Sequence, residues 1–318
     1  MSGNTALTPQ EVADMLKIAK NTVYELIKRG ELKGYKVGKK IRVDTRDVEE
    51  YKNRKKNTVS RQNNTRKKDN SSLLDILYPG NTREDDFVIC GQDMLLDILS
   101  RYIEMHYPEI RTFRSYVGSY KGLLGLYMGK VQVATAHLWD GDSGKYNIPF
   151  VRRLIPGIPT VIIHLACRME GFYVAKGNPK NIHSWEDFKK PDINLINRER
   201  GCGVRILLDE HLRLLNIKGK NISGYNRECL SHLAVASTVA RGEADVGIGN
   251  EKTSLQVQNI DFIPLQKERY ELVIKKDDMD NPPFNSITKI LKSDKFKQEL
   301  AGIGGYDLSE TGNITAEL

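Results

Sequence analysis

The chain has 318 residues, of which 39% are hydrophobic, and this is enough for one large core and a small satellite domain. No apolar run reaches the roughly 18 residues of a membrane helix, and the start "MSGNTALTPQEVADML" lacks the pattern of a secretory signal, so we expect a cytoplasmic protein without a membrane partner. The four cysteines and six histidines are scattered without CxxC or HExxH spacing, so we expect no disulfides, no metal site and no resident cofactor.

The excess positive charge is concentrated near the N-terminus. Residues 1–72 contain 18 Lys and Arg against nine Asp and Glu, whereas the rest of the chain contains 31 against 32. The net charge of +8 therefore comes from the N-terminal segment alone. Such an asymmetry predicts a polyanionic partner for one end of the chain and a separate function for the other.

Three helices and a hairpin are predicted within residues 7–56. The stretch "TPQE" combines a capping threonine, a first-turn proline and a returning glutamate, so it should start a helix that runs to about Leu16. After a tight turn, the periodic stretch "NTVYELIKRG" predicts a second helix. The alternation in "YKVGKKIRV" around Gly38 predicts a hairpin with a basic tip, and "TRDVEEYKNRKK" after Asp44 predicts a third helix.

This layout resembles the winged helix-turn-helix of the excisionase-like branch of the MerR-type DNA-binding domains, over the whole of residues 7–56. The resemblance implies that the second helix enters the major groove of double-stranded DNA and that the wing lies over an adjacent groove or backbone. Asn21 and Thr22 suit base edges, whereas the lysines suit phosphates. Ala19 stands where relatives usually place a serine cap. The matching DNA-binding positions are Lys20, Asn21, Thr22, Tyr24 and Lys28 on the helix and Lys39, Lys40 and Arg42 on the wing.

A linker separates this segment from the rest of the chain. The sequence "RKKNTVSRQNNTRKKDNSS" is polar and basic and is almost devoid of apolar residues, so it cannot build a core. We therefore place the winged helix-turn-helix domain at residues 1–56, a basic flexible linker at 57–72 and a second domain at 73–318.

Residues 73–318 alternate short apolar runs with amphipathic segments, which predicts an α/β domain around a largely parallel sheet. The runs "FVIC", "RTFRSYV", "VQVATA" and "INLINR" are predicted strands, and helical patterns follow most of them. A crossing region around "TVIIHLACRMEGFYVAKGNPK" and returning strands near "FIPLQKERYELVI" predict two lobes joined by two crossings.

A second resemblance covers nearly all of residues 87–310. The stretches "VGSYKGLLGLYMGKVQVATAHLWDGDSGKYNIP", "NRERGCGVRILLD" and "SHLAVASTVARGEADVGIG" resemble the cytosolic periplasmic-binding-protein-like domain related to molybdate- and tungstate-binding proteins. The resemblance implies a two-lobed type II clamshell that acts as the ligand sensor of a one-component transcriptional regulator.

Three strand-to-helix turns, at residues 91–93, 118–121 and 201–204, should point into one cleft of such a clamshell. Helix N-termini with glycine-permitted close approach suit an anion, because their amides and their dipole favour negative charge. Relatives typically carry Ser and Thr at the positions of Cys202 and Val204, so the identity of the oxyanion stays open. The candidate ligand-binding residues of the turns are Gln92, Asp93, Ser119, Tyr120, Cys202, Gly203 and Val204.

The segment "AHLWDGDSGKYN" is unusually polar for a loop of an α/β domain. Its polar residues either line the cleft or satisfy one another, and the sequence leaves both interpretations open for His137, Asp140, Tyr146 and Asn147. Cys202 has a second interpretation as a nucleophile, with His137 or His232 approaching it in space, although a thiol at a helix start is not by itself a mechanism.

The sequence thus predicts a regulator, without enzymatic activity, that senses a small oxyanion, with molybdate or tungstate as the leading effector by resemblance. A homodimer is expected, because paired half-sites in DNA need paired readers. Two alternatives remain: a clamshell enzyme acting on a small acidic metabolite, and an excisionase-like architectural DNA-binding protein that needs no ligand.

Overall fold

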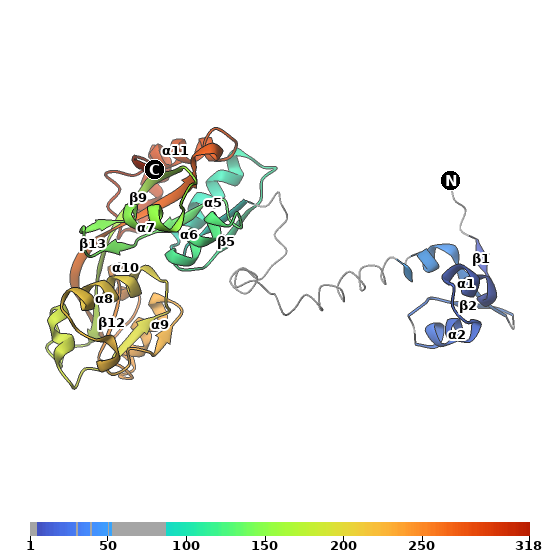
Figure 1. Ribbon diagram of the computed structural model, residues 1–318, viewed down its shortest axis with the longest axis horizontal. Coiled ribbons are helices and arrows are strands. Elements are labelled where there is room, and N and C mark those ends of the chain that lie inside the picture. The colour runs from blue at the N-terminus through green and yellow to red at the C-terminus, as the bar shows by residue number, and fades with distance from the viewer. Residues whose placement is uncertain (1–4, 30, 39, 50, 53–86) are drawn as a thin grey trace. The chain divides into compact units, whose positions relative to one another are not determined.

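The structure is a computed structural model that describes residues 5–29, 31–38, 40–49, 51–52 and 87–318 (Figure 1). The chain divides into two compact units, residues 1–76 and residues 77–318. The predicted linker at 57–72 lies outside the described residues. Within the described part of the chain, no helix is long and apolar enough to cross a membrane.

The N-terminal unit contains two helices joined by a short turn. Helix α1 (Pro9–Leu16) begins at the predicted capping box, in which the Thr8 hydroxyl accepts from the N–H of Glu11 and the Glu11 carboxylate accepts from the N–H of Thr8 at 2.7 Å. Helix α2 (Lys20–Lys28) follows the extended residue Ala19, which makes no side-chain cap. The missing serine therefore leaves the start of α2 without a side-chain acceptor, as the sequence indicated.

A three-stranded antiparallel sheet completes the N-terminal unit. Strands β2 (Tyr35–Val37) and β3 (Lys40–Asp44) form the predicted hairpin, and β1 (Ala6–Leu7) pairs with the other edge of β3. Strand β1 was not predicted, because two residues carry no periodic signal. Residues 45–49 and 51–52 are helical and correspond to the predicted third helix. The core of the unit consists of Val12, Ala13, Val23, Leu26, Leu32, Val43 and Val48.

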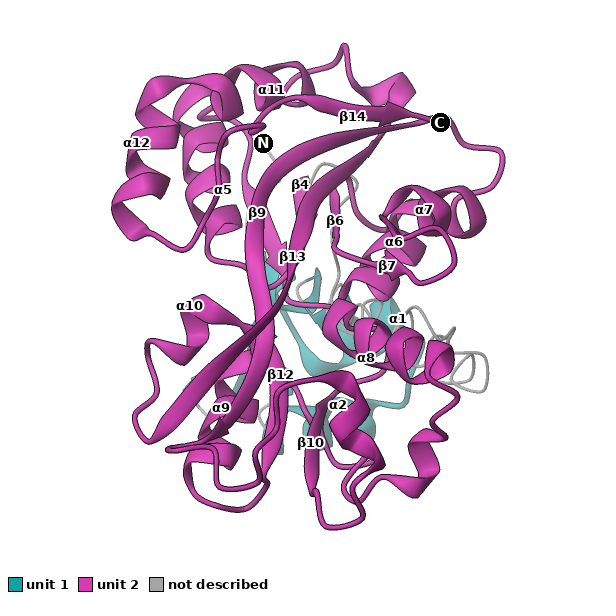
Figure 2. Cartoon of the chain, turned by 90° about the vertical axis from the view of Figure 1, so that its left-hand side faces the viewer, with its two compact units in different colours: residues 1–76 teal, residues 77–318 magenta. Residues whose placement is uncertain are grey.

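The second unit is organised around two long strands that run through both of its lobes (Figure 2). Strands β9 (Thr160–Ala175) and β13 (Ile260–Lys275) pair antiparallel along their length. Strand β12 (Val246–Asn250) extends this ladder in one lobe, and β6 (Ala134–Ala136) and β14 (Ile314–Glu317) extend it in the other. The same two strands thus support both lobes and form the connection between them.

Lobe 1 comprises residues 87–159 and 276–318, and lobe 2 comprises residues 176–259. Lobe 1 contains β4 (Phe87–Cys90), α5 (Leu95–His106), β5 (Thr112–Ser115), α6 (Ser119–Tyr127), β7 (Trp139–Asp140), β8 (Lys145–Tyr146), α7 (Ile148–Leu154), a 3-10 turn (Lys276–Asp278), α11 (Phe284–Lys292) and α12 (Asp294–Ile303). Lobe 2 contains a 3-10 turn (Trp185–Lys189), β10 (Leu195–Arg198), α8 (Gly203–Leu214), a second 3-10 turn (Gly219–Asn221), β11 (Glu228–Cys229), α9 (His232–Ala240) and α10 (Glu251–Ser254).

The predicted α/β clamshell is present, but the prediction of a largely parallel sheet was wrong for its centre. Parallel pairing occurs between β4 and β5 and between β10 and its neighbours β11 and β12, whereas β9 pairs antiparallel with β12, β13 and β14. Strand β9 is buried along nearly its whole length, so most of its residues are apolar on both faces, as in buried parallel strands.

Candidate functional site

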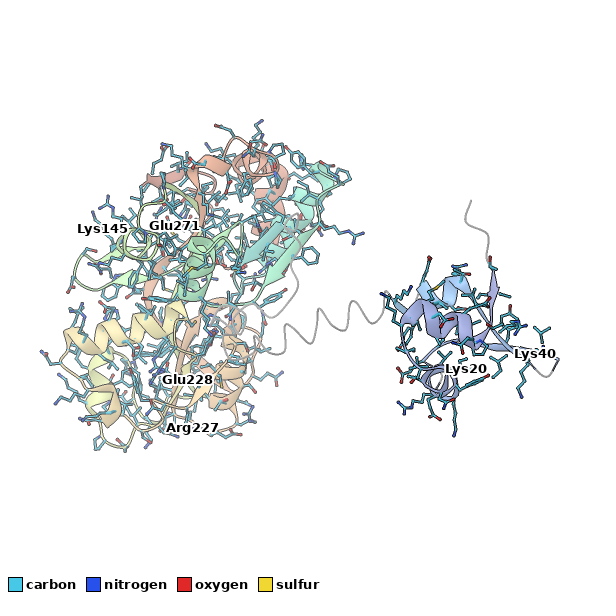
Figure 3. All side chains as sticks on the ribbon, turned by 45° about the vertical axis from the view of Figure 1, so that its right-hand side comes forward. Lys20, Lys40, Lys145, Arg227, Glu228 and Glu271 are labelled. Atoms are coloured by element: carbon cyan, nitrogen blue, oxygen red, sulfur yellow. The ribbon has the colours of Figure 1, made fainter. Side chains whose placement is uncertain are left out.

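The N-terminal unit gathers basic side chains on one concave surface. Lys20 and Tyr24 from α2 meet Lys40 and Arg42 from β3 at a groove of about 320 Å³, whose other lining residues are Thr8, Pro9, Gln10 and Ile41. Figure 3 shows Lys20 and Lys40 on this unit. The side chains of Lys20, Asn21, Thr22, Tyr24, Lys28 and Lys40 are exposed and that of Arg42 is half-buried, whereas Lys39 lies outside the described residues.

The second unit contains a cavity of about 520 Å³ between its lobes. The three strand-to-helix turns that the sequence singled out all border it: Gly91 to Asp93 before α5, Gly118 and Ser119 at the start of α6, and Cys202 at the start of α8. Turns from both lobes therefore face one space.

Glycines in these turns allow the two lobes to approach closely. A Cβ on Gly118 would lie 2.9 Å from the Cα of Cys202, and a Cβ on Gly203 would lie 2.6 Å from the His137 ring. The N–H of Tyr120 donates to the carbonyl of Gly201 at 3.0 Å. The α6 and α8 turns thus touch across the cleft. An added methyl group at Gly118 would push these two turns apart, and one at Gly203 would push the start of α8 away from His137.

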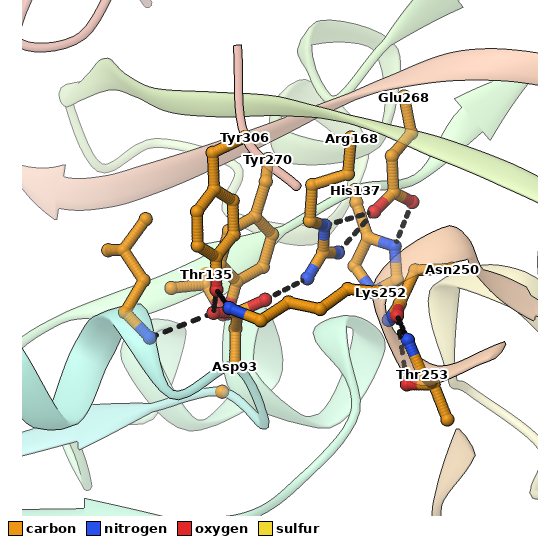
Figure 4. Close-up of polar contacts among 12 residues, drawn as sticks. Asp93, Thr135, His137, Arg168, Asn250, Lys252, Thr253, Glu268, Tyr270 and Tyr306 are labelled. Atoms are coloured by element: carbon orange, nitrogen blue, oxygen red, sulfur yellow. Dashed lines mark hydrogen bonds and ion pairs between the residues drawn. The ribbon is translucent and has the colours of Figure 1, made fainter. Parts of the chain in front are cut away.

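A buried ionic network forms the base of the cavity (Figure 4). The guanidinium of Arg168 on β9 contacts the carboxylate of Asp93 and, through Nε at 2.6 Å, that of Glu268 on β13. The other Glu268 oxygen lies 2.7 Å from Nδ1 of His137, and Tyr306 donates to Asp93 at 2.6 Å. Burial alone would raise the pKa values of Asp93 and Glu268, but Arg168 and these hydrogen bonds hold both below their ordinary values.

Two further basic groups, Lys252 and His232, face the cavity, and neither pairs with a carboxylate in the part of the chain that the structure describes. The ammonium of Lys252 donates to the Tyr306 hydroxyl at 3.1 Å, and no ion pair of Lys252 occurs among the described residues. Burial lowers the pKa of Lys252. Burial, together with the positive charges of Arg198 and Arg168, lowers the pKa of His232 well below its ordinary value, so this imidazole is neutral at pH 7. Lys252 is thus a cation available to an anionic ligand.

Half of the predicted ligand-binding residues border the cavity. Gln92, Asp93, Ser119, His137 and Cys202 are among its lining residues, whereas Tyr120, Tyr146, Asn147, Gly203 and Val204 are not. Val204 is part of the core of lobe 2.

The polar segment from 136 to 147 combines both interpretations that the sequence left open. His137 faces the cavity, but Asn147 is fully buried, accepts from the N–H of Leu138 and donates to Glu271. The Tyr146 hydroxyl accepts from Gln266 at 2.6 Å. Apart from His137, these polar groups satisfy structural hydrogen bonds.

Several cavity residues were missed by sequence reasoning, among them Thr135, Arg168, Asn250, Lys252, Tyr270 and Tyr306. The sequence did contain a sign of Arg168, because Arg168 and Glu170 interrupt the apolar run of β9. The structure shows that both side chains are buried. Charged residues are rarely fully buried unless they are paired or functional. Glu170, Glu268 and His137 also place possible metal-ligand atoms within 4.8 Å of one another.

The environment of Cys202 argues against its interpretation as a nucleophile. The side chain is buried, and burial raises the pKa of its thiol to about 11. A catalytic cysteine needs a lowered pKa in a partly exposed site, so Cys202 serves as a turn residue that packs in lobe 2.

We expect thiol labelling to reflect this difference. At pH 8 a thiol with a pKa of about 11 is ionised to roughly 0.1%, so a disulfide reagent should leave Cys202 unmodified until the protein unfolds. Cys229 is only half-buried and should react first. A stopped-flow comparison of the wild type with Cys229→Ser checks this, and a rapid phase that survives the substitution would contradict it.

Comparison with known proteins adds two family matches and several relatives. Residues 6–56 match the model of a helix-turn-helix domain, and residues 100–292 match that of the PBP superfamily domain. The uncharacterized protein YvgK of Bacillus subtilis (strain 168) is 38% identical over 317 residues, which cover 100% of both chains.

Two solved structures share the fold of the second unit. A substrate-binding protein assigned to a phosphate ABC transporter of Clostridium perfringens, with bound phosphate, aligns at a TM-score of 0.52 and 13% identity, covering 70% of this chain and 98% of that one. The tungstate ABC transporter structure from Geobacter sulfurreducens aligns at a TM-score of 0.51 and 10% identity, covering 70% and 100%. At such identities the similarity concerns the fold alone.

Proposed function

The chain belongs to the PBP superfamily and carries an N-terminal helix-turn-helix domain, and from this premise we propose that it is a one-component transcriptional regulator whose clamshell senses a small oxyanion. The observation that carries the proposal is the convergence of three strand-to-helix turns on one cavity, in a chain that also carries an exposed basic groove on its DNA-binding domain. Such a regulator would act in the cytoplasm.

The chemistry of the cavity favours an oxyanion held largely by neutral donors. The positive charge of Arg168 is already offset by Asp93 and Glu268, so it cannot neutralise a ligand on its own. The starts of α6 and α8, the Ser119 hydroxyl and the Lys252 ammonium supply donors and a favourable potential. Molybdate and tungstate lead by family resemblance, and the fold shared with a phosphate-bound protein adds phosphate to the candidates.

A thermal-shift screen of the full chain tests the effector class. We expect tungstate or molybdate, and to a smaller extent phosphate, to raise the melting temperature, because a ligand at about 100 times its dissociation constant stabilises the folded state by roughly 2.7 kcal/mol. Absence of any shift with all three would overturn the oxyanion assignment. Consumption of a bound organic acid in a product assay would instead support the enzyme alternative.

The basic groove of the N-terminal unit can be tested separately by mutation. Replacing Lys20 and Lys40 by alanine should weaken binding to selected and random duplexes alike, because lysines contact phosphates. The plot of log affinity against log salt should become shallower by up to about 2, since each phosphate contact contributes about 0.9. Asn21→Ala should instead reduce the preference between sequences. Fluorescence anisotropy over a salt series measures both effects.

A matched control removes the same charge from the other unit. Lys218 and Lys220 are exposed in lobe 2, and their replacement by alanine should leave the salt dependence unchanged. Equal losses in both double variants would mean that net charge, and not the groove, governs binding. DNA affinity that is the same with and without the effector would favour the architectural alternative. The proposed homodimer predicts a two-fold-related pair of half-sites in the selected DNA.

A further inference from the structure

Three buried side chains converge beneath the base of the cavity. His137 follows β6, Glu170 lies on β9 and Glu268 lies on β13, and one possible ligand atom from each lies within 4.8 Å of the others. Glu170 is fully buried, and Glu268 and His137 are 1% and 9% exposed. The two glutamates therefore lie on the two strands that connect the lobes, and His137 lies beside them at the end of β6.

Glu170 differs from the other buried carboxylates of this region. Both of its oxygens are buried, and neither accepts a hydrogen bond from an N–H or O–H donor among the described residues; the polar group beside it is the Glu268 carboxylate. Glu271, also fully buried on β13, accepts from Asn147 and Thr315 at 2.7 Å each (Figure 3 labels Glu271). A buried carboxylate without partners is costly, so Glu170 requires either a proton or a cation.

The carboxylates close to Glu170 outnumber the positive charges that pair with them. The Arg168 guanidinium contacts the carboxylates of Asp93 and Glu268, and Glu170 is a third carboxylate that interacts with its charge. The other positive charge that acts on Glu170 is that of Arg198, which pairs with Glu199. Burial and the negative charge of Glu268 raise the pKa of Glu170 well above its ordinary value, so in the absence of a cation it holds a proton.

We propose that His137, Glu170 and Glu268 bind a divalent first-row transition-metal ion. One imidazole nitrogen and two carboxylate oxygens form a mixed set that suits Mn²⁺ or Zn²⁺, since imidazole favours zinc and carboxylates favour manganese. Arg168 bonds the Glu268 oxygen that does not contact His137, so it can remain in place beside the metal. The ion would tie β9, β13 and the residue after β6 together where the lobes join. This site does not depend on the proposed oxyanion or on DNA binding.

The test uses the full chain after treatment with a chelator. Titration with Mn²⁺, followed by the electron paramagnetic resonance signal of the free ion, should show one tight site per chain, and equilibrium dialysis should show the same for Zn²⁺. Glu170→Gln should weaken this site by more than the about 10- to 100-fold that loss of an outer-shell partner costs. His137→Gln is the second variant and should have the same effect. The control Glu228→Gln removes a carboxylate from a two-residue strand of lobe 2 and should retain the site.

Melting curves separate loss of the site from loss of the fold. Without metal, Glu170→Gln should melt no lower than the wild type, because the amide is neutral, like the protonated carboxyl that it replaces. Mn²⁺ should raise the melting temperature of the wild type and of Glu228→Gln but not that of Glu170→Gln. Equal binding by the wild type and Glu170→Gln, or absence of a tight site for both metals, would overturn the proposal and leave Glu170 as a protonated carboxyl. Because no oxyanion is present, a failed effector screen does not affect this result.

Discussion

Replacing Arg168 by methionine is expected to lower the free energy of unfolding by about 3 to 5 kcal/mol, because it leaves two buried carboxylates without their cation. The side chains of Arg168, Asp93 and Glu268 are 5%, 7% and 2% exposed, so water cannot replace the lost guanidinium. Methionine keeps much of the volume, so the loss measures charge and not a cavity. Urea denaturation at pH 7 gives the value.

The effect should depend on pH in a defined direction. Burial alone would raise the pKa values of Asp93 and Glu268, but Arg168 holds them below the ordinary values of 3.8 and 4.5. A carboxyl with a lowered folded-state pKa stabilises the fold above its unfolded-state pKa and loses this contribution as the pH falls. In Arg168→Met no cation offsets the burial of Asp93 and Glu268, so their pKa values rise. Protonation at low pH then removes the cost of burying their charges. The difference in the free energy of unfolding between the wild type and Arg168→Met should therefore become smaller as the pH falls from 7 toward 4.

Arg269→Met provides the control. Arg269 is 29% exposed and pairs with Glu310 at the surface. Its Nε also donates to the buried Glu271 at 3.2 Å, but Glu271 keeps its bonds to Asn147 and Thr315 without it. Its loss should cost no more than about 1 kcal/mol. Similar losses in the two variants would mean that the network below the cavity is no more important than a surface ion pair.

Replacing Ser119 by alanine is expected to weaken tungstate binding by about 10-fold to 150-fold, because a hydrogen bond to a charged group is worth roughly 1.5 to 3 kcal/mol. Ser119 is buried in the first turn of α6 and lines the cavity. Its oxygen accepts from the N–H of His137 at 3.3 Å, which leaves its own hydrogen free to point toward a ligand. Titration calorimetry measures the affinity, and DNA binding without effector should hardly change.

A second role of Ser119 predicts a different result. If the hydroxyl serves only the N–H of His137, the substitution leaves that buried N–H without an acceptor and lowers stability by about 1 to 3 kcal/mol, with tungstate affinity intact. Ser293→Ala is the matched control, because Ser293 caps α12 away from the cavity, and its loss should cost about 1 kcal/mol of stability alone. Unchanged tungstate affinity in Ser119→Ala would remove Ser119 from the ligand site.

The parts of this protein that the sequence determined by itself depend on local interactions. The capping box between Thr8 and Glu11 starts α1 within one helical turn, and the basic hairpin follows from the alternation around Gly38. The three strand-to-helix turns were found for the same reason, since a strand, a glycine and a helical pattern lie next to one another in the chain. Each of these features brings together residues only a few positions apart.

The base of the cavity was decided by the tertiary structure alone. Arg168 and Glu268 lie 100 positions apart, and they meet because the antiparallel register of β9 and β13 pairs them directly across the two strands. Asp93 comes from the first chain segment of lobe 1 and Tyr306 from the second, and the two side chains meet at the same place. No periodicity in the sequence encodes this register, because both strands are long and β9 is buried on both faces, so the alternation that normally fixes strand pairing is missing. The charge that a ligand meets in the cleft is therefore set by strand pairing between distant segments, and not by any local motif.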